Sequence, residues 1–236
     1  MTKPTNQDVM PMWPVDAPED YVRARIEIAE AERALRDQVE AVAEARRRLP
    51  VGAELAHYEL AEGPADPGLD EPVRTTPLPE VFGEHDSLVV YHLMFGPDDK
   101  QACPMCSMWV DGFHGVSRHI ARHAAFAVVA KATVPALRSW ARRRGWDGLR
   151  LLSSHGTTFN RDLNVEYPDG AQRPAISVLV REGSTVRHFF TLPANYLDDT
   201  QRGIDSLSPV WNLLDLLPAG RGDWFPDNSY AGRSRG

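Results

Sequence analysis

The sequence predicts an α/β protein in which helices cover both faces of a central mixed sheet. Residues 88–95 form a continuous apolar run of strand length, which is typical of a strand buried on both of its faces. Segments of strand and helix character then alternate along the chain as far as residue 163. Residues 175–191 predict two antiparallel strands joined by a tight turn, and one more helix follows them.

The chain has the composition of an ordinary globular protein, with 236 residues of which 42% are hydrophobic and 25% are charged. A chain of this length can bury a sizeable core, so the fold needs neither a disulfide nor a metal, and the 2 cysteines are free for chemistry. The formal net charge of −7 argues against a general nucleic-acid partner. The N-terminus lacks an apolar signal core, and no window approaches the roughly 18 apolar residues of a membrane span. We therefore expect a cytoplasmic protein with no membrane partner.

The N-terminal part of the chain predicts a tail followed by a long helix. Residues 1–17 are polar and contain several prolines, so they are expected to be a flexible tail. Residues 18–50 are rich in Ala, Glu and Arg, with acidic residues early and basic residues late, which favours a helix. This helix packs either on its own domain or against a second copy, as a homodimer. The apolar stripe that would make either contact repeats every seven residues, at Ile28, Leu35, Val42 and Leu49.

Residues 51–223 are expected to form one domain around the sheet, and residues 224–236 a C-terminal tail. Residues 51–87 mix short apolar alternations with glycine and proline, which predicts a hairpin and a loop. Thr133 is placed to N-cap a helix that ends at Gly145. The other predicted elements, in chain order, are a helix over 107–123, strands over 126–130 and 149–153, a short helix over 157–163, strands over 175–180 and 185–191, and a helix over 205–217.

Both cysteines lie in one tetrapeptide, Cys103-Pro104-Met105-Cys106, between the buried strand and the next predicted helix. Active sites of open α/β sheets collect at such strand ends. Unpaired N–H groups at the helix N-terminus favour a thiolate at Cys103, and Pro104 suits the first helical position because it has no N–H to leave unpaired. Cys106 lies one turn further on and can attack a mixed disulfide formed at Cys103. The pattern therefore predicts thiol–disulfide exchange, with Cys103 attacking and Cys106 resolving.

The same cysteines also begin a pattern of zinc ligands. The spacing Cys103-x2-Cys106-x12-His119-x3-His123 matches that of a zinc finger. In a finger, a strand and the start of a short helix separate the cysteines from the histidines, whereas the redox interpretation runs one helix through this segment. On a continuous helix Cys103 and His119 would lie roughly 24 Å apart, at ~1.5 Å per residue, which is too far for one ion. The two interpretations exclude each other.

Copper is a further candidate, because two thiolates and a distant histidine suit Cu(I). The histidines considered for this role are His155 and His188, and the spacing selects neither. A metal-binding protein that holds zinc or copper without turnover is therefore the alternative to an enzyme. An interaction module in which the cysteine pair is only a regulatory redox switch is a third interpretation.

Three motifs give the chain a family resemblance: YHLMFGP at 91–97, CPMCSMWVDGF at 103–113 and LLDLLPAGR at 213–221. They resemble a bacterial family of thioredoxin-like proteins catalogued as a domain of unknown function, number 899. The likeness covers most of the chain, from the N-terminal helix to about Asp223. It implies a thioredoxin-like fold near the peroxiredoxin branch, with the two cysteines in the redox position. It implies no known substrate, so the expected partner is an unidentified redox protein or a small thiol.

The chain also departs from related patterns. Peroxiredoxins place Thr or Ser three residues before the cysteine that attacks peroxide, and here that position is Lys100, which argues against a dedicated peroxidase. Thioredoxins face their cysteines with a cis-proline that precedes a strand. By position Pro174 is the candidate, and a trans proline that starts a strand is the alternative. Trp109, on the helix after the cysteines, is expected to pack near the site.

Overall fold

The computed structural model describes residues 13–64, 66–69, 72–196 and 201–229, and the chain divides into two compact units, Met1–Leu49 and Pro50–Gly236. The first unit contains the predicted long helix, α1 (Glu19–Arg47), with acidic residues in its first turn and arginines in its last. Residues 1–12 of the expected tail lie outside the described residues. The packing of the α1 stripe, on this chain or on a second copy, stays a prediction.

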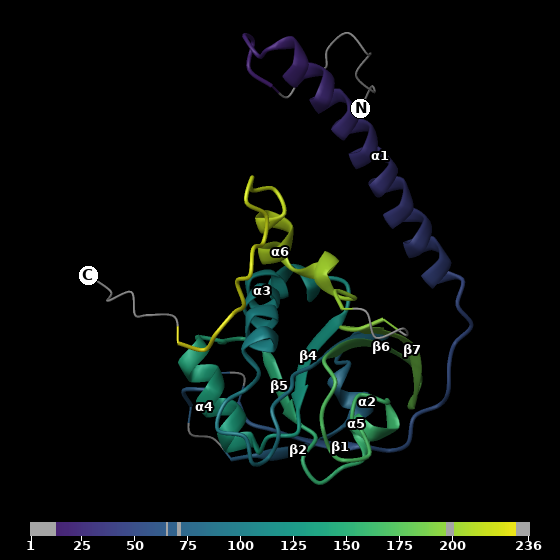
Figure 1. The fold of residues 1–236 in the computed structure, drawn as a ribbon. Coiled ribbons are helices and arrows are strands. Elements are labelled where there is room, and N and C mark those ends of the chain that lie inside the picture. Colours follow the sequence, from purple (N-terminus) through teal and green to yellow (C-terminus); the bar gives the residue numbers. More distant parts are fainter. Residues whose placement is uncertain (1–12, 65, 70–71, 197–200, 230–236) are drawn as a thin grey trace. The chain divides into compact units, whose positions relative to one another are not determined.

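The second unit is built on one mixed sheet of seven strands in the order β2-β1-β5-β4-β3-β6-β7 (Figure 1). In the centre, β3, β4 and β5 run parallel. β6 pairs antiparallel with β3 and β7 pairs antiparallel with β6, which confirms the predicted hairpin, while β1 and β2 form a second hairpin beside β5. The strands are β1 (Glu59–Glu62), β2 (Arg74–Pro77), β3 (Ser87–His92), β4 (Ala125–Ala130), β5 (Arg150–Ser153), β6 (Ala175–Glu182) and β7 (Thr185–Pro193).

Helices cover both faces of this sheet, as predicted. α3 (Pro104–Ile120) and α4 (Val134–Arg144) lie on one face, and the short helices α2 (Leu78–Val81) and α5 (Phe159–Asp162) lie on the other (Figure 1). Consecutive β3 side chains point alternately to the two faces, so Tyr91 joins the core under α3 while neighbouring positions join the core under α2 and α5. The apolar run at 88–95 therefore belongs to a strand that is covered on both sides. The thioredoxin-like α/β fold class is confirmed.

The prediction of one continuous helix over 205–217 is wrong. The structure has a 3₁₀ turn, Asp205–Leu207, and then a separate short helix, α6 (Pro209–Leu214). Pro209 starts the second helix, and the residue before it, Ser208, is extended with φ −95° and ψ 120°. A residue that precedes proline is pushed out of the helical region, so the helix cannot run through this point.

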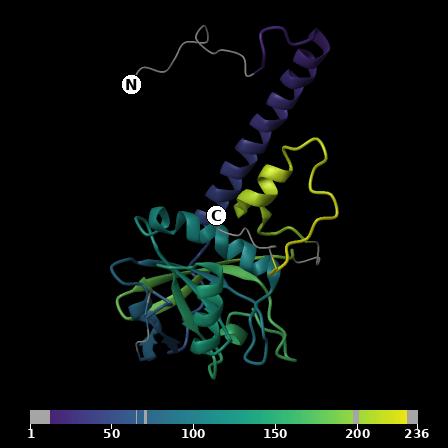
Figure 2. The same cartoon turned by 90° about the vertical axis from the view of Figure 1, so that its left-hand side faces the viewer.

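The chain beyond α6 leaves the body and then returns to it (Figure 2). Residues 224–229, expected to belong to the C-terminal tail, contact the body: Asn228 Nδ2 donates a hydrogen bond to the Ala102 carbonyl at 2.9 Å. Residues 230–236 lie outside the described residues. Among the helices that the structure describes, none is long and apolar enough to span a membrane.

Candidate functional site

The two cysteines lie where β3 passes into α3. The Cys103 N–H donates to the Met94 carbonyl at 2.9 Å, which ties the start of the helix to the segment after β3. Cys103 is the N-cap residue and Pro104 occupies the first turn of α3. The Cys103 carbonyl then accepts the first helical hydrogen bond, from the Ser107 N–H at 2.9 Å. The helix therefore begins three residues earlier than the predicted Ser107, and the N–H groups of its first turn favour a thiolate at Cys103.

The two thiols are chemically unequal. Cys103 is partly exposed, whereas Cys106 is 1% exposed, and both are free. A hydrogen bond from the Cys106 thiol, helped by the backbone N–H groups of Cys106 and Met105, outweighs the opposing effect of burial and lowers the pKa of Cys103 to about 6. The neighbouring Cys103 sulfur and burial raise the pKa of Cys106. At neutral pH the accessible sulfur is therefore a thiolate and the buried one is a thiol.

Tyr91 is a third member of the site that the sequence did not reveal. Its side chain is fully buried, and its hydroxyl makes no hydrogen bond of normal geometry among the described residues. Burial raises the pKa of Tyr91, and the nearby sulfurs of Cys106 and Cys103 raise it further. The hydroxyl in turn acts on Cys106, where it and the Met94 backbone favour the thiolate. A lone phenol within the mainly apolar run at 88–95 was the available signal.

Two cavities reach the cysteine pair. The first, of about 380 Å³, is lined by both cysteines together with Trp109 and Pro174. Trp109 is 3% exposed and packs in the core under α3, as expected. The second cavity, of about 770 Å³, meets the first at Cys103 and is lined by several charged side chains. Cys103 thus has open space on two sides, while Cys106 faces only the first cavity.

Pro174 lines the first cavity beside the cysteines, and its peptide bond is trans, one of the two alternatives that the sequence left open. The described residues contain no cis peptide bond. The Pro174 carbonyl accepts a hydrogen bond from the Ala194 N–H at 3.0 Å, which continues the pairing of β6 with β7. Pro174 therefore stands directly before β6 as a trans residue.

Comparison with known proteins identifies the family. A family model described as "Bacterial protein of unknown function (DUF899)" matches residues 10–233. The chain belongs to this family. A search of curated proteins finds no match.

Solved structures with a similar chain course include three peroxiredoxin-type proteins. Reduced Plasmodium vivax 2-Cys peroxiredoxin has 14% identity and a TM-score of 0.47, covering 70% of this chain and 96% of its own. Mycobacterium bovis AhpC has 16% identity and a TM-score of 0.47, with 75% and 98% covered. Xanthomonas campestris peroxiredoxin Q has 17% identity and a TM-score of 0.42, with 56% and 81% covered.

The histidines considered as metal ligands are not brought to the cysteines. α3 runs without a break from Pro104 to Ile120, so His119 lies at the opposite end of the helix from Cys103, and His123 follows the helix. A zinc finger needs a chain reversal in this segment, and the continuous helix has none. His155 and His188, the copper candidates, line neither cavity at Cys103. Within the described ranges, no three His, Cys, Asp or Glu side chains are grouped to hold a metal ion.

The lowered pKa of Cys103 predicts a distinctive pH dependence of alkylation. For the reduced protein, the rate of modification by iodoacetamide should rise with a midpoint near pH 6 and reach a plateau above about pH 7, because only the thiolate reacts. Cys106 should stay unlabelled in the folded protein. Mass spectrometry of quenched samples measures both sites, and the denatured chain, in which both label with ordinary thiol behaviour, is the control. A midpoint at pH 8 to 9 for Cys103, as for a free thiol, would contradict the assignment.

Proposed function

We propose that this protein is a thiol–disulfide oxidoreductase in which Cys103 is the nucleophile and Cys106 the resolving thiol. The observation that carries the proposal is the inequality of the two sulfurs. Cys103 is accessible with a lowered pKa at a helix N-terminus, and Cys106 is buried beside it with a raised pKa. Two cysteines that only pack in a core do not require different exposures and pKa values. Thiol–disulfide exchange does, because one sulfur attacks the substrate and the other resolves the mixed disulfide.

The reaction proceeds in two exchanges. The Cys103 thiolate attacks one sulfur of a substrate disulfide, so that a mixed disulfide forms and the other substrate sulfur leaves as a thiolate that takes a proton from solvent. The Cys106 thiol then loses its proton and attacks the Cys103 sulfur, which releases the second substrate thiol. The net change oxidises the protein dithiol to a disulfide and reduces one substrate disulfide to two thiols.

The surroundings of Cys106 lower the cost of the second exchange. Cys106 must become a thiolate in a buried place, where an unpaired charge is costly. The Tyr91 hydroxyl and the Met94 N–H both favour that thiolate, so they act as positioning groups for the resolving sulfur. Lys100, three residues before Cys103, offers no hydroxyl at the position where peroxiredoxins carry one, which supports a disulfide rather than a peroxide as substrate.

The dithiol is regenerated by a small thiol or by a redox protein, and the turnover needs no cofactor beyond the two sulfurs. We place the activity in the cytoplasm, where a reducing thiol pool is available to restore the pair.

Equilibration of the protein with a series of glutathione redox buffers tests this function. After acid quenching and thiol trapping, mass spectrometry should show a single reversible transition from two labelled cysteines to none, at one defined potential. The Cys106→Ser variant is the control, because it cannot close the internal disulfide. A pair that stays reduced across the series, or a chain that is isolated with a stoichiometric metal ion on the two thiols, would show that the proposal is wrong.

A further inference from the structure

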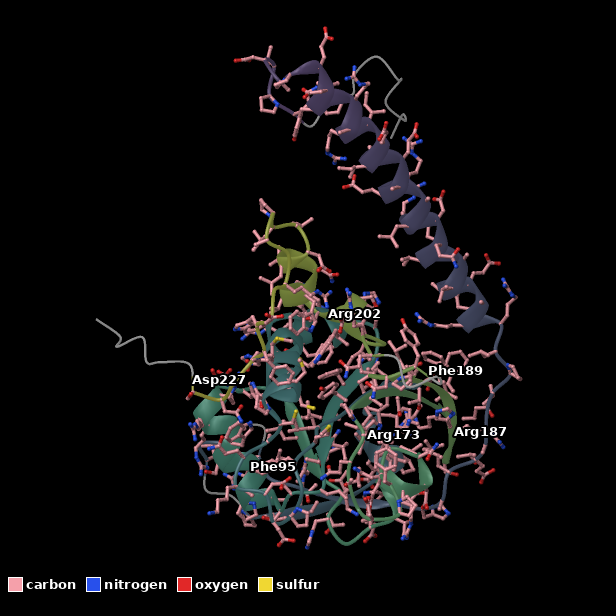
Figure 3. All side chains as sticks on the ribbon, viewed as in Figure 1. Phe95, Arg173, Arg187, Phe189, Arg202 and Asp227 are labelled. Carbon is pink, nitrogen blue, oxygen red and sulfur yellow. The ribbon has the colours of Figure 1, made fainter. Side chains whose placement is uncertain are left out.

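The C-terminal segment 202–228, called the strap below, lies over the cysteine site. It begins at Arg202 and ends close to Asp227, and Figure 3 labels Arg202 at the upper middle of the body and Asp227 at its left edge. At its start, the Gly203 N–H donates to the Ala194 carbonyl at 2.7 Å. A Cβ atom at Gly203 would lie 2.2 Å from the Pro193 carbonyl oxygen, so only glycine allows the strap to cross the end of β7 this closely.

The strap is attached on both sides of the redox pair. Its helix α6 packs on α3, where a Cβ added at Gly112 would already touch the Pro209 ring at 3.4 Å. Its far end is held at the residue directly before Cys103, by the hydrogen bond from Asn228 to Ala102. The strap is therefore part of the wall around the cysteines rather than a loop that passes at a distance.

Arg221 links separate parts of the strap to one another. Arg221 makes a bidentate pair with Asp215, at 2.7 and 2.6 Å, also binds Asp205, and lies over the Trp211 ring with 4.9 Å to its centroid. The residues on either side, Gly220 and Gly222, have φ values of +61° and +55°, a conformation that favours glycine. The third motif of the family resemblance, LLDLLPAGR, thus supplies both partners of this ion pair, Asp215 and Arg221.

The ion pairs of the strap balance positive and negative charge at the first cavity. The charged residues in its described lining are Arg202, Asp205 and Arg221. Arg202 also binds Asp205 at 3.0 Å and Asp215 at 3.5 Å, so two arginines are matched by two aspartates. The second cavity is acidic, because its Lys131 is already paired with Glu166 at 2.8 Å and the remaining charged lining residues are Asp98, Asp99 and Asp169. Among the described residues that line the two cavities, none offers an unmatched cation to an anionic substrate.

The rest of the first cavity is largely apolar and aromatic. Trp211 and Trp224 meet edge to face with 5.5 Å between ring centroids, and Phe225 lines the cavity beside them. Trp224 and Phe225 are 44% and 62% exposed, so a ligand can cover apolar surface that is now open to water. A volume of about 380 Å³ lies in the range of small-molecule sites.

We propose that this cavity is a substrate site for small, uncharged disulfides that carry an aromatic group, and that the strap provides the wall which recognises them. The inference rests on the proposed function, since it places the ring between Trp211, Trp224 and Phe225 and the disulfide against the Cys103 sulfur. An anionic disulfide such as oxidised glutathione would lose hydration of its carboxylates and gain no free cation in return.

Single-turnover reduction of two disulfides tests the proposal. Prereduced protein is mixed with 4,4′-dithiodipyridine, which is neutral and aromatic, or with hydroxyethyl disulfide, which is neutral and has no ring. The double variant Trp224→Ala, Phe225→Ala should lower the rate constant for the aromatic disulfide by about tenfold or more and change that for hydroxyethyl disulfide by less than about twofold. Leu216→Ala, on the strap but outside the cavity lining and 76% exposed, is the matched control and should change neither.

Binding without chemistry separates this inference from the proposed function. The Cys103→Ser, Cys106→Ser variant has no thiol, since the chain contains only 2 cysteines, and it cannot react with the probe. Titration with 4,4′-dithiodipyridine should quench tryptophan fluorescence saturably, the aromatic double variant should weaken that binding, and oxidised glutathione should not bind.

Each result decides one of the two ideas. Binding without any turnover of the wild type would overturn the redox function and leave the site standing. The site would be overturned if 4,4′-dithiodipyridine showed no saturable binding, or if the aromatic double variant slowed the reduction of both disulfides equally. It would also be overturned if the double variant slowed only the reduction of insulin, because the strap would then recognise a protein substrate.

Discussion

Replacement of Cys103 by Ser should lower disulfide reduction by at least about 1,000-fold, because a serine hydroxyl is not ionised near neutral pH and cannot replace the thiolate nucleophile. The measurement is dithiol-dependent reduction of insulin or of hydroxyethyl disulfide by the purified variant. The structure supports the role of nucleophile for only one of the two sulfurs. Cys103 is the cysteine with the pKa lowered to about 6, and Cys106 is 1% exposed and cannot meet a substrate first.

Cys106→Ser is the matched control and should behave differently. The first exchange still occurs at Cys103, so a mixed disulfide should accumulate and be visible as a mass increase of one substrate half. Turnover should fall, since no resolving thiol remains. Serine keeps a hydroxyl that can donate to Cys103, whereas Cys106→Ala removes that donor and should move the Cys103 alkylation midpoint above pH 6. Equal loss of the first exchange in the serine variants at both positions would contradict the assignment of roles.

Trp146→Ala should lower the free energy of unfolding by about 3–5 kcal/mol, the cost usual for removing a large buried aromatic side chain. Trp146 is 0% exposed and lies in the core under α3 and α4. Its Nε1–H donates to Asp111 Oδ1 at 2.7 Å, and Asp111 also binds Arg144, so the variant both opens a cavity and removes one donor from this carboxylate. Chemical denaturation followed by circular dichroism measures the change.

Trp224→Ala provides the comparison for that experiment. The same substitution at a residue that is 44% exposed should cost no more than about 1 kcal/mol, because little core packing is lost. A cost below about 1 kcal/mol for Trp146→Ala, or equal costs at the two positions, would show that the core under α4 is not packed as described.

Much of the fold follows from local patterns in the sequence. The apolar run at 88–95 marked the strand buried on both faces, and Gly145 marked the end of α4, where it adopts φ +73°. The turn between β6 and β7 marked the hairpin. These signals are readable because backbone conformation and two-sided burial act on neighbouring residues and leave a pattern in the chain itself.

Sequence reasoning left one detail of the fold open and missed another. By its position before a strand, Pro174 was compatible with a cis or a trans bond, and the structure has the trans form. The break at Pro209 was readable from the pre-proline rule, yet the apolar spacing outweighed it in the prediction of one long helix.

The sequence by itself determined that a C-x-x-C pair would lie between a buried strand and a helix, because that placement depends only on the order of neighbouring segments. Only the tertiary structure decided what surrounds the pair. Tyr91 is one residue in an apolar strand until the sheet brings its hydroxyl to Cys106, and Arg221 is one basic residue near the C-terminus until Asp205 and Asp215 hold it above the site. Charge balance and cavity shape arise from contacts between distant segments, so they leave no local pattern in the sequence.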